Sequence, residues 1–158
     1  MDDAGDGTRE GPDARCAIIA VPVRARASAV YRFASDPLNL PAWAPGFARS
    51  VSRQGGLWIV ETADGPVEIA FAPRNALGVL DHRVRLPDGT AIVNPMRVVP
   101  NGEGPGGEAS VVMFTLFRME GWDDARMASD AALVRSDLER LAALVSGEPA
   151  EGSVDSPG

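Results

Sequence analysis

The sequence predicts an α+β fold in which a curved antiparallel sheet of seven strands packs around one long C-terminal helix. From Asp123 to Ser146, apolar residues recur every three or four positions, and charged residues such as Asp137 lie largely off this stripe. Asp123 suits the N-cap, and Gly147 suits the position after the last turn. The preceding segments are separated by turn pairs such as Asp88-Gly89, which indicate antiparallel hairpins. At ~1.5 Å per residue the helix is roughly 36 Å long. A sheet that covers such a helix tends to leave a cavity between the two, where small molecules bind.

The other elements follow in chain order. A first strand is expected at residues 15–24, where apolar side chains occupy both alternating faces. Two short helices follow at residues 28–33 and 38–43; Ser28 can cap the first, and Asp36-Pro37 ends it. Six strands come next, each bounded by turn residues, at residues 47–53, 57–62, 67–72, 79–86, 90–99 and 108–118.

Length and charge predict one folded domain between two acidic tails. The chain of 158 residues has a net charge of −7, to which residues 1–13 contribute −4 and residues 147–158 contribute −3. Both ends are rich in Gly, Pro, Ser and acidic residues, a composition typical of disordered segments. We expect residues 14–146 to form the folded, small-molecule-binding domain. Its zero net charge and lack of a basic stripe argue against nucleic acid as a partner. No apolar run approaches the ~18 residues of a membrane span.

Residue counts exclude several kinds of chemistry. All fifteen basic residues are arginine, so a Schiff base on a lysine amine is not available. Cys16 and His82 are the only residues of their types and lie far apart in the chain, so they cannot build a zinc site. A single cysteine excludes an internal disulfide, and the acidic N-terminus lacks a signal-peptide pattern; both features favour the cytoplasm. There is no glycine motif for phosphates or dinucleotides. We therefore expect neither a metal nor a cofactor.

Four local stretches carry a resemblance to a known family. The stretch VYRFASDPLNLPAWAPGF at residues 30–47 has a helix that ends in Asp-Pro and leads to a tryptophan. The others are GVLDHRVRLPDG at residues 78–89, NPMRVVPNG at residues 94–102 and VVMFTLFR at residues 111–118. With the order of elements, they resemble the bacterial polyketide cyclase/dehydrase branch of the START-like, or SRPBCC, superfamily over residues 15–146. The resemblance implies the helix-grip fold. Members of this superfamily include cyclases, lyase-like enzymes, lipid carriers and hormone receptors, so the fold alone does not define the reaction.

His82 is the first candidate for a functional side chain. Strand alternation over residues 79–86 places it with Leu80 and Val84 on the apolar face, and places Asp81 on the other face, where we expect it to pair with an arginine. A histidine that faces a cavity can act as general acid or base, because its pKa lies near the working pH. A core histidine that bonds a backbone carbonyl is the structural alternative.

Asn94 and Glu61 are the other candidate catalytic side chains. Asn94 alternates with Ile92 and Met96 on an apolar face, where its amide can bind a ligand carbonyl or hydroxyl group. Pro95 indicates a bulge, and a structural hydrogen bond at that bulge is the alternative role for Asn94. If Glu61 points inward it is a carboxylic acid with a raised pKa, and if it points outward it is a solvated charge at the rim.

A set of aromatic, methionine and threonine side chains is expected to line the cavity for a flat, largely apolar ligand. These candidate ligand-binding residues are Tyr31, Trp43, Phe47, Phe71, Met96, Met113, Thr115, Phe117 and Met127. For each of them, ordinary core packing is the alternative. Trp43 differs from the others because it lies between Pro41 and Pro45, which resembles the lid of a pocket.

Together with the resemblance, these residues predict a cofactor-independent cyclase or dehydratase of natural-product biosynthesis that binds a hydrophobic, polycyclic or polyketide-like molecule. His82 would shuttle protons while Asn94 or Glu61 orients a carbonyl group. A non-catalytic carrier or sensor of lipids or metabolites is the alternative. A third reading is an interaction protein whose cavity is filled by side chains. The sequence is compatible with a monomer or a homodimer.

Overall fold

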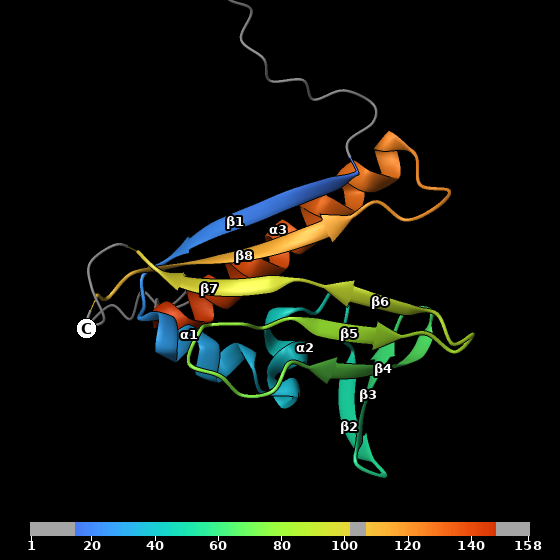
Figure 1. Cartoon of the computed structure of the whole chain (residues 1–158), viewed down its shortest axis with the longest axis horizontal. Helices are drawn as coiled ribbons and strands as arrows, with labels where there is room; N and C mark the ends of the chain where they lie inside the picture. Colours follow the sequence, from blue (N-terminus) through green and yellow to red (C-terminus); the bar gives the residue numbers. More distant parts are fainter. Residues whose placement is uncertain (1–14, 102–106, 148–158) are drawn as a thin grey trace, which may run out of the picture.

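The computed structural model describes residues 15–101 and 107–147, which form eight strands, three α-helices and one 3-10 helix (Figure 1). In chain order they are β1 (Cys16–Val23), α1 (Ala27–Ala34), the 3-10 helix η1 (Pro37–Asn39), α2 (Leu40–Trp43), β2 (Ser50–Gln54), β3 (Leu57–Thr62), β4 (Gly65–Phe71), β5 (His82–Arg85), β6 (Ala91–Asn94), β7 (Met96–Pro100), β8 (Ser110–Phe117) and α3 (Asp124–Ser146). Except for Gly147, the predicted tails at residues 1–13 and 147–158 lie outside the described residues.

The strands form two antiparallel sheets, and the prediction of a single seven-stranded sheet is therefore wrong in detail. One sheet has the order β1-β8-β7, and the other has the order β2-β3-β4-β5-β6. Figure 1 shows β6 and β7 running end to end, so that the second sheet leads directly into the first. Helix α3 packs on the inner side of β1 and β8. The α+β architecture and the long C-terminal helix agree with the prediction.

The sheets separate at Pro95, in the middle of the predicted strand at residues 90–99. Proline has no amide hydrogen to donate to a neighbouring strand. The next amide, that of Met96, donates to the Oδ1 atom of Asp81 at 2.9 Å instead of to a strand carbonyl. The pairing of β6 with β5 therefore ends at Asn94, and β7 begins one residue after Pro95 with β8 as its partner.

Strand β5 is shorter than predicted because the residues before it turn toward β7. The amide of Leu80 donates to the carbonyl of Met96, and the amide of Val98 donates to the carbonyl of Gly78, both at 2.9 Å. Gly78 has φ +72° and lies so close to the Val98 carbonyl that a Cβ atom would be only 2.0 Å from its oxygen. The predicted inward direction of His82 is nevertheless confirmed, since its side chain is buried.

Helix α3 agrees with the prediction at both ends and on its buried face. The side chain of Asp123 accepts a hydrogen bond from the amide of Arg126 at 2.8 Å, and Gly147 adopts the left-handed conformation at φ +66°. The buried members of its apolar stripe are Met127, Leu138 and Leu141. This stripe closes the core against the sheets, as expected for an amphipathic helix.

The short helices begin and end near the predicted positions. Helix α1 starts at Ala27, one residue before the predicted cap Ser28, and its N-cap residue Arg26 makes no side-chain cap bond. Asp36 caps η1, because its Oδ1 atom accepts a hydrogen bond from the amide of Leu38 at 3.0 Å. Helix α2 follows directly and carries Trp43 at its last position.

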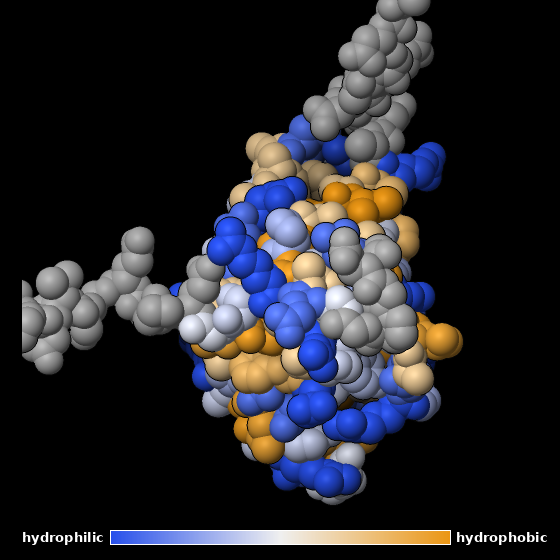
Figure 2. Space-filling view, turned by 90° about the vertical axis from the view of Figure 1, so that its left-hand side faces the viewer, coloured by the Kyte–Doolittle hydropathy of each residue, from blue (hydrophilic) through white to orange (hydrophobic). Residues whose placement is uncertain are grey.

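The surface has a mixed character. Figure 2 shows several separate hydrophobic patches between hydrophilic residues on the face that it presents. No helix within residues 15–101 and 107–147 is long and apolar enough to cross a membrane.

Candidate functional site

A cavity of about 650 Å³ lies between the five-stranded sheet, α2 and α3. Its volume falls within the range of ~300–1,000 Å³ that is typical of small-molecule sites. Most of the wall is apolar, and a few polar side chains interrupt it. Five of the predicted site residues belong to this wall, namely His82, Asn94, Trp43, Phe47 and Phe117. Among the described residues, no group of three or more His, Cys, Asp or Glu side chains is arranged to hold a metal ion.

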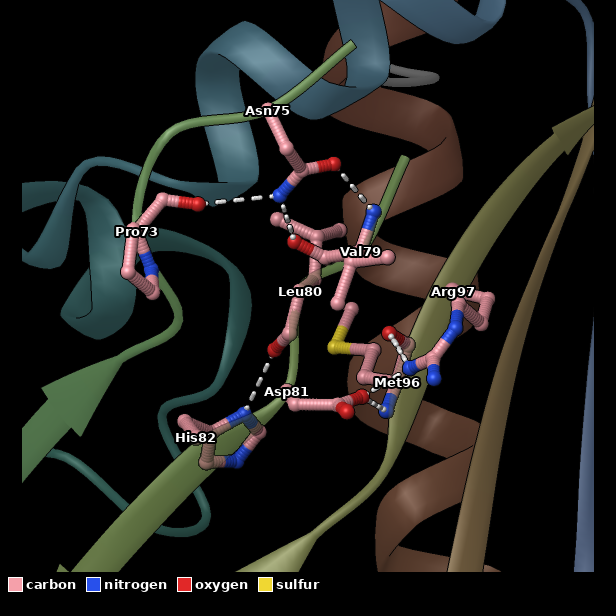
Figure 3. Close-up of polar contacts among 8 residues, drawn as sticks. All are labelled: Pro73, Asn75, Val79, Leu80, Asp81, His82, Met96 and Arg97. Carbon is pink, nitrogen blue, oxygen red and sulfur yellow. Dashed lines mark hydrogen bonds and ion pairs between the residues drawn. The ribbon is translucent and has the colours of Figure 1, made fainter. Parts of the chain in front are cut away.

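The side chain of His82 is held in place by one backbone carbonyl and two aromatic rings. Its Nδ1 atom lies 3.0 Å from the carbonyl oxygen of Leu80 (Figure 3). Its ring packs between Phe71 and Phe114, with centroid distances of 5.1 Å and 5.9 Å. The neighbouring Asp81 pairs with Arg97, as predicted, and also accepts the Met96 amide. These contacts fix the backbone next to the imidazole relative to β7.

The contact with Leu80 determines which nitrogen of His82 carries the hydrogen. A carbonyl oxygen only accepts, so Nδ1 must donate, and in the neutral imidazole Nε2 keeps its lone pair. Burial lowers the pKa of His82, and the Leu80 carbonyl and the Asp81 carboxylate oppose this change in pKa only in part. The imidazole is therefore neutral at pH 7 and presents Nε2 as a base, on the side of the ring away from Leu80 (Figure 3). His82 therefore makes the carbonyl bond of the structural alternative and also lines the cavity; its role as acid or base stays a prediction.

Asn94 lies beside His82 in the cavity wall. The two residues pair directly between β5 and β6, so their side chains are neighbours on one face of the sheet. The Asn94 amide makes no side-chain hydrogen bond to any other residue in the described ranges, and it is only half-buried. The structural hydrogen bond at Pro95, which was the alternative, is absent there. Asn94 therefore has both a donor and an acceptor available to a ligand.

Asp137 is a titratable group of the cavity wall that the sequence prediction missed. It projects from α3 into the cavity, where it is half-buried. Burial raises the pKa of its carboxyl group to about 6, while the Gly46 amide and the Arg140 guanidinium oppose this increase. The sequence prediction placed Asp137 on the polar side of the helix. Its spacing of three residues after Val134 and four before Leu141 was the available sign that it borders the apolar stripe.

Asp137→Asn is expected to stabilise the protein at pH 8 and to have little effect at pH 4. The folded-state pKa of about 6 exceeds the reference value of 3.8, so the stability linked to this proton is present below 3.8 and lost as the pH rises through 6. Because solvent screens a half-exposed carboxylate, we expect a gain of only about 1 kcal/mol at pH 8. Urea unfolding at both pH values measures it. Glu139→Gln, an exposed change on the same helix, is the control. An equal effect of Asp137→Asn on the free energy of unfolding at both pH values would contradict the raised pKa of Asp137.

Other predicted site residues lie outside the cavity wall. Glu61 is exposed on the outer face of β3 and cannot contact a ligand in the cavity, which corrects its candidate role. Met113 and Thr115 pair with exposed residues of β1, among them Ile18, which is 70% exposed; they therefore occupy the outer face of β8. Phe114 takes the inner position instead. The sequence prediction assigned Met113 and Thr115 to the inner face, which is wrong; both faces of β8 are apolar, so strand alternation could not identify the inner one.

The remaining candidates are structural. Met96 and Met127 are buried members of the core, and neither lines the cavity. The hydroxyl oxygen of Tyr31 accepts a hydrogen bond from the Asn75 amide at 3.0 Å, outside the cavity wall. Phe71 contacts the His82 ring without lining the cavity. Core packing, the alternative for each predicted lining residue, therefore applies to the two methionines.

Comparisons with known proteins identify the fold. No protein-family model and no curated protein sequence matches the chain. Among solved structures, XoxI of Bacillus cereus is 13% identical with a TM-score of 0.63, and the match covers 84% of this chain and 96% of that one. DynU16, from the dynemicin biosynthetic locus, is 20% identical with a TM-score of 0.60, over 85% of this chain and 49% of that one.

A plant enzyme has the same architecture. Norcoclaurine synthase of Thalictrum flavum, solved as a point mutant with a transition-state analogue, is 14% identical with a TM-score of 0.57; the match covers 82% of this chain and 92% of that one. Identities of 20% or less indicate a shared fold and leave the function open. The chain therefore shares its fold, the predicted helix-grip arrangement of antiparallel strands around a long C-terminal helix, with these structures.

Proposed function

We propose that this protein is a cofactor-independent cyclase/dehydratase for a hydrophobic, polycyclic or polyketide-like molecule bound in the cavity. One observation carries the proposal: two titratable groups of one apolar cavity have pKa values shifted in opposite directions. Burial keeps His82 neutral and basic at Nε2, and it keeps a fraction of Asp137 protonated near neutral pH. Both shifts favour the uncharged form, so a neutral imidazole that can act as base and a protonated carboxyl group that can act as acid coexist in one cavity near pH 6.

The proposed reaction is an intramolecular aldol condensation. Nε2 of His82 removes a proton from the carbon next to a ketone, and the Asn94 amide donates a hydrogen bond to the enolate oxygen. The enolate carbon forms a bond to a second carbonyl carbon, and His82 returns the proton to the resulting alkoxide. In the dehydration step, His82 removes a second proton from the same carbon while Asp137 protonates the hydroxyl group, which leaves as water. Proton exchange with solvent then restores both side chains.

The proposal is tested with 1-(2-acetylphenyl)propan-2-one, whose aldol closure and loss of one water give fluorescent 3-methyl-1-naphthol. We expect the protein to raise the initial rate at least ~10²-fold over buffer, since one positioned acid or base typically contributes ~10²–10⁴-fold. The rate should decline above pH 6 as Asp137 loses its proton. Asp137→Asn should lower the rate and remove this decline. Binding of the diketone without any rate increase would contradict the enzyme proposal.

A carrier is the second candidate, and the mainly apolar wall favours it. A carrier would bind 3-methyl-1-naphthol and the diketone with similar affinity and convert neither. The third reading, a cavity filled by side chains, is not supported, because a volume of about 650 Å³ remains. The rate measurement and a titration with 3-methyl-1-naphthol therefore distinguish the two remaining candidates.

A further inference from the structure

The indole of Trp43 contains a buried hydrogen-bond donor without an acceptor. Trp43 is only 4% exposed, and its Nε1 is the single fully buried side-chain nitrogen or oxygen in residues 15–101 and 107–147 that has no hydrogen-bond partner. Buried donors in proteins are nearly always paired, because an unpaired one loses its hydrogen bond to water and gains nothing. Trp43 also belongs to the cavity wall. Its Nε1 atom has almost no accessible surface of its own, so the missing acceptor must come from a bound molecule toward which the indole turns.

Trp43 and Asp137 border the same end of the cavity. Trp43 is the last residue of α2, and α2 packs against α3, which carries Asp137. Gly46, three residues after Trp43, lies beside the carboxyl group, since a Cβ atom on Gly46 would be 3.6 Å from the Oδ1 atom of Asp137. A ligand group at this end of the cavity meets a donor from α2 and a carboxyl group from α3.

The charges of the wall restrict what that ligand group can be. Four carboxyl groups line the cavity, from Asp64, Asp88, Asp130 and Asp137. The cationic side chain of the wall, Arg126, is already paired, with its Nε atom 3.1 Å from the Oδ1 atom of Asp130. A carboxylate ligand would be repelled. An ammonium group would suit Asp137 but leave the Trp43 donor unpaired. An uncharged hydroxyl group can accept from Trp43 and also donate to a carboxylate.

We propose that the Nε1–H group of Trp43 binds a hydroxyl oxygen of the ligand, so that the cavity selects uncharged aromatic compounds bearing a hydroxyl group. The inference rests on the proposed function, in that it takes the cavity as the ligand site, but it does not require turnover. It also gives the proposed reaction a place for its intermediate. The β-hydroxy ketone formed by aldol closure carries such a hydroxyl group, and Asp137 is the group that protonates it.

A matched series of naphthalenes tests the proposal by calorimetric titration at pH 7. The compounds are 1-(2-naphthyl)ethanol, 2-ethylnaphthalene, 1-(2-naphthyl)ethylamine, 2-acetylnaphthalene and 2-naphthoic acid, which differ at one polar group. We expect the alcohol to bind about fivefold to tenfold more tightly than 2-ethylnaphthalene, the effect of one net hydrogen bond, and more tightly than the other three. Equal binding of alcohol and hydrocarbon overturns the inference, and so does tightest binding of the amine or the ketone.

Trp43→Phe removes the N–H group and keeps an aromatic ring. It should abolish most of the advantage of the alcohol while changing the affinity for 2-ethylnaphthalene less than twofold. Trp58→Phe, at a half-buried tryptophan outside the cavity wall, is the control and should leave the whole series unchanged. If Trp43→Phe weakens every compound equally, the indole has a packing role alone and the inference is wrong.

A measurement on the unaltered protein covers the case in which Trp43→Phe does not fold. The chain has three tryptophans, so its proton–nitrogen correlation spectrum contains three indole signals. Saturation with the alcohol should move the Trp43 signal downfield, and saturation with 2-ethylnaphthalene should not. The Trp58→Phe and Trp122→Phe variants each remove one signal and so assign the Trp43 signal by elimination. If 2-ethylnaphthalene binds and no indole signal responds selectively to the alcohol, the inference fails and the cavity remains the ligand site. If no compound binds, the proposed function fails as well.

Discussion

His82→Ala is expected to lower the rate of naphthol formation by ~10²–10⁴-fold, the usual effect of removing a general base. The residue combines a neutral imidazole, a free Nε2 atom and a place in the cavity wall. Alanine removes the base and the packing of the imidazole between Phe71 and Phe114. Initial rates with 1-(2-acetylphenyl)propan-2-one measure the effect. Circular dichroism and titration with 3-methyl-1-naphthol establish that the variant is folded and still binds.

His82→Gln separates proton transfer from positioning. Glutamine can donate a hydrogen bond to the Leu80 carbonyl, but it does not titrate near neutral pH. We expect its rate to be close to that of His82→Ala, while its thermal stability is closer to that of the unaltered protein. Asn94→Ala should reduce the rate less, because Asn94 orients the substrate without moving a proton. Full activity of His82→Gln would exclude proton transfer by His82 and leave it a positioning role.

Leu138→Ala is expected to lower the free energy of unfolding by about 2–5 kcal/mol, the range for removing a buried leucine side chain. Leu138 is 1% exposed, lies at the centre of the apolar stripe of α3 and borders the cavity. Truncation removes apolar contacts and enlarges an existing cavity, which the surrounding helices and strands cannot fill without moving. Urea unfolding at pH 7 measures the change.

Leu144→Ala on the same helix is the matched control for Leu138. Its side chain is 48% exposed, and alanine has the higher helix propensity, so the change should stay within about 0.5 kcal/mol. Similar losses at both positions would mean that the effect comes from the helix backbone and that Leu138 does not close the core. A loss at Leu138 alone supports the buried face assigned to α3.

Local features of the sequence were sufficient to predict most elements. The long helix was predictable from its apolar period, from Asp123 as N-cap and from Gly147 after its end, because each acts within one or two helical turns. The inward direction of His82 followed from strand alternation, which needs only the residues next to it. The same rule failed for Met113 and Thr115, because β8 is apolar on both faces and only its pairing with β1 selects the inner one.

The helix, the hairpins and the inward direction of His82 were therefore determined by the sequence alone, since they arise from the short-range period of apolar residues and from turn chemistry. Tertiary structure decided the break at Pro95, because the Met96 amide found its acceptor in Asp81, fifteen residues away. It also decided the chemistry of the site. The burial of Asp137 and the unpaired N–H of Trp43 depend on how α2 packs against α3. A pKa value and an unpaired donor are properties of an environment, and residues far apart in the chain create that environment.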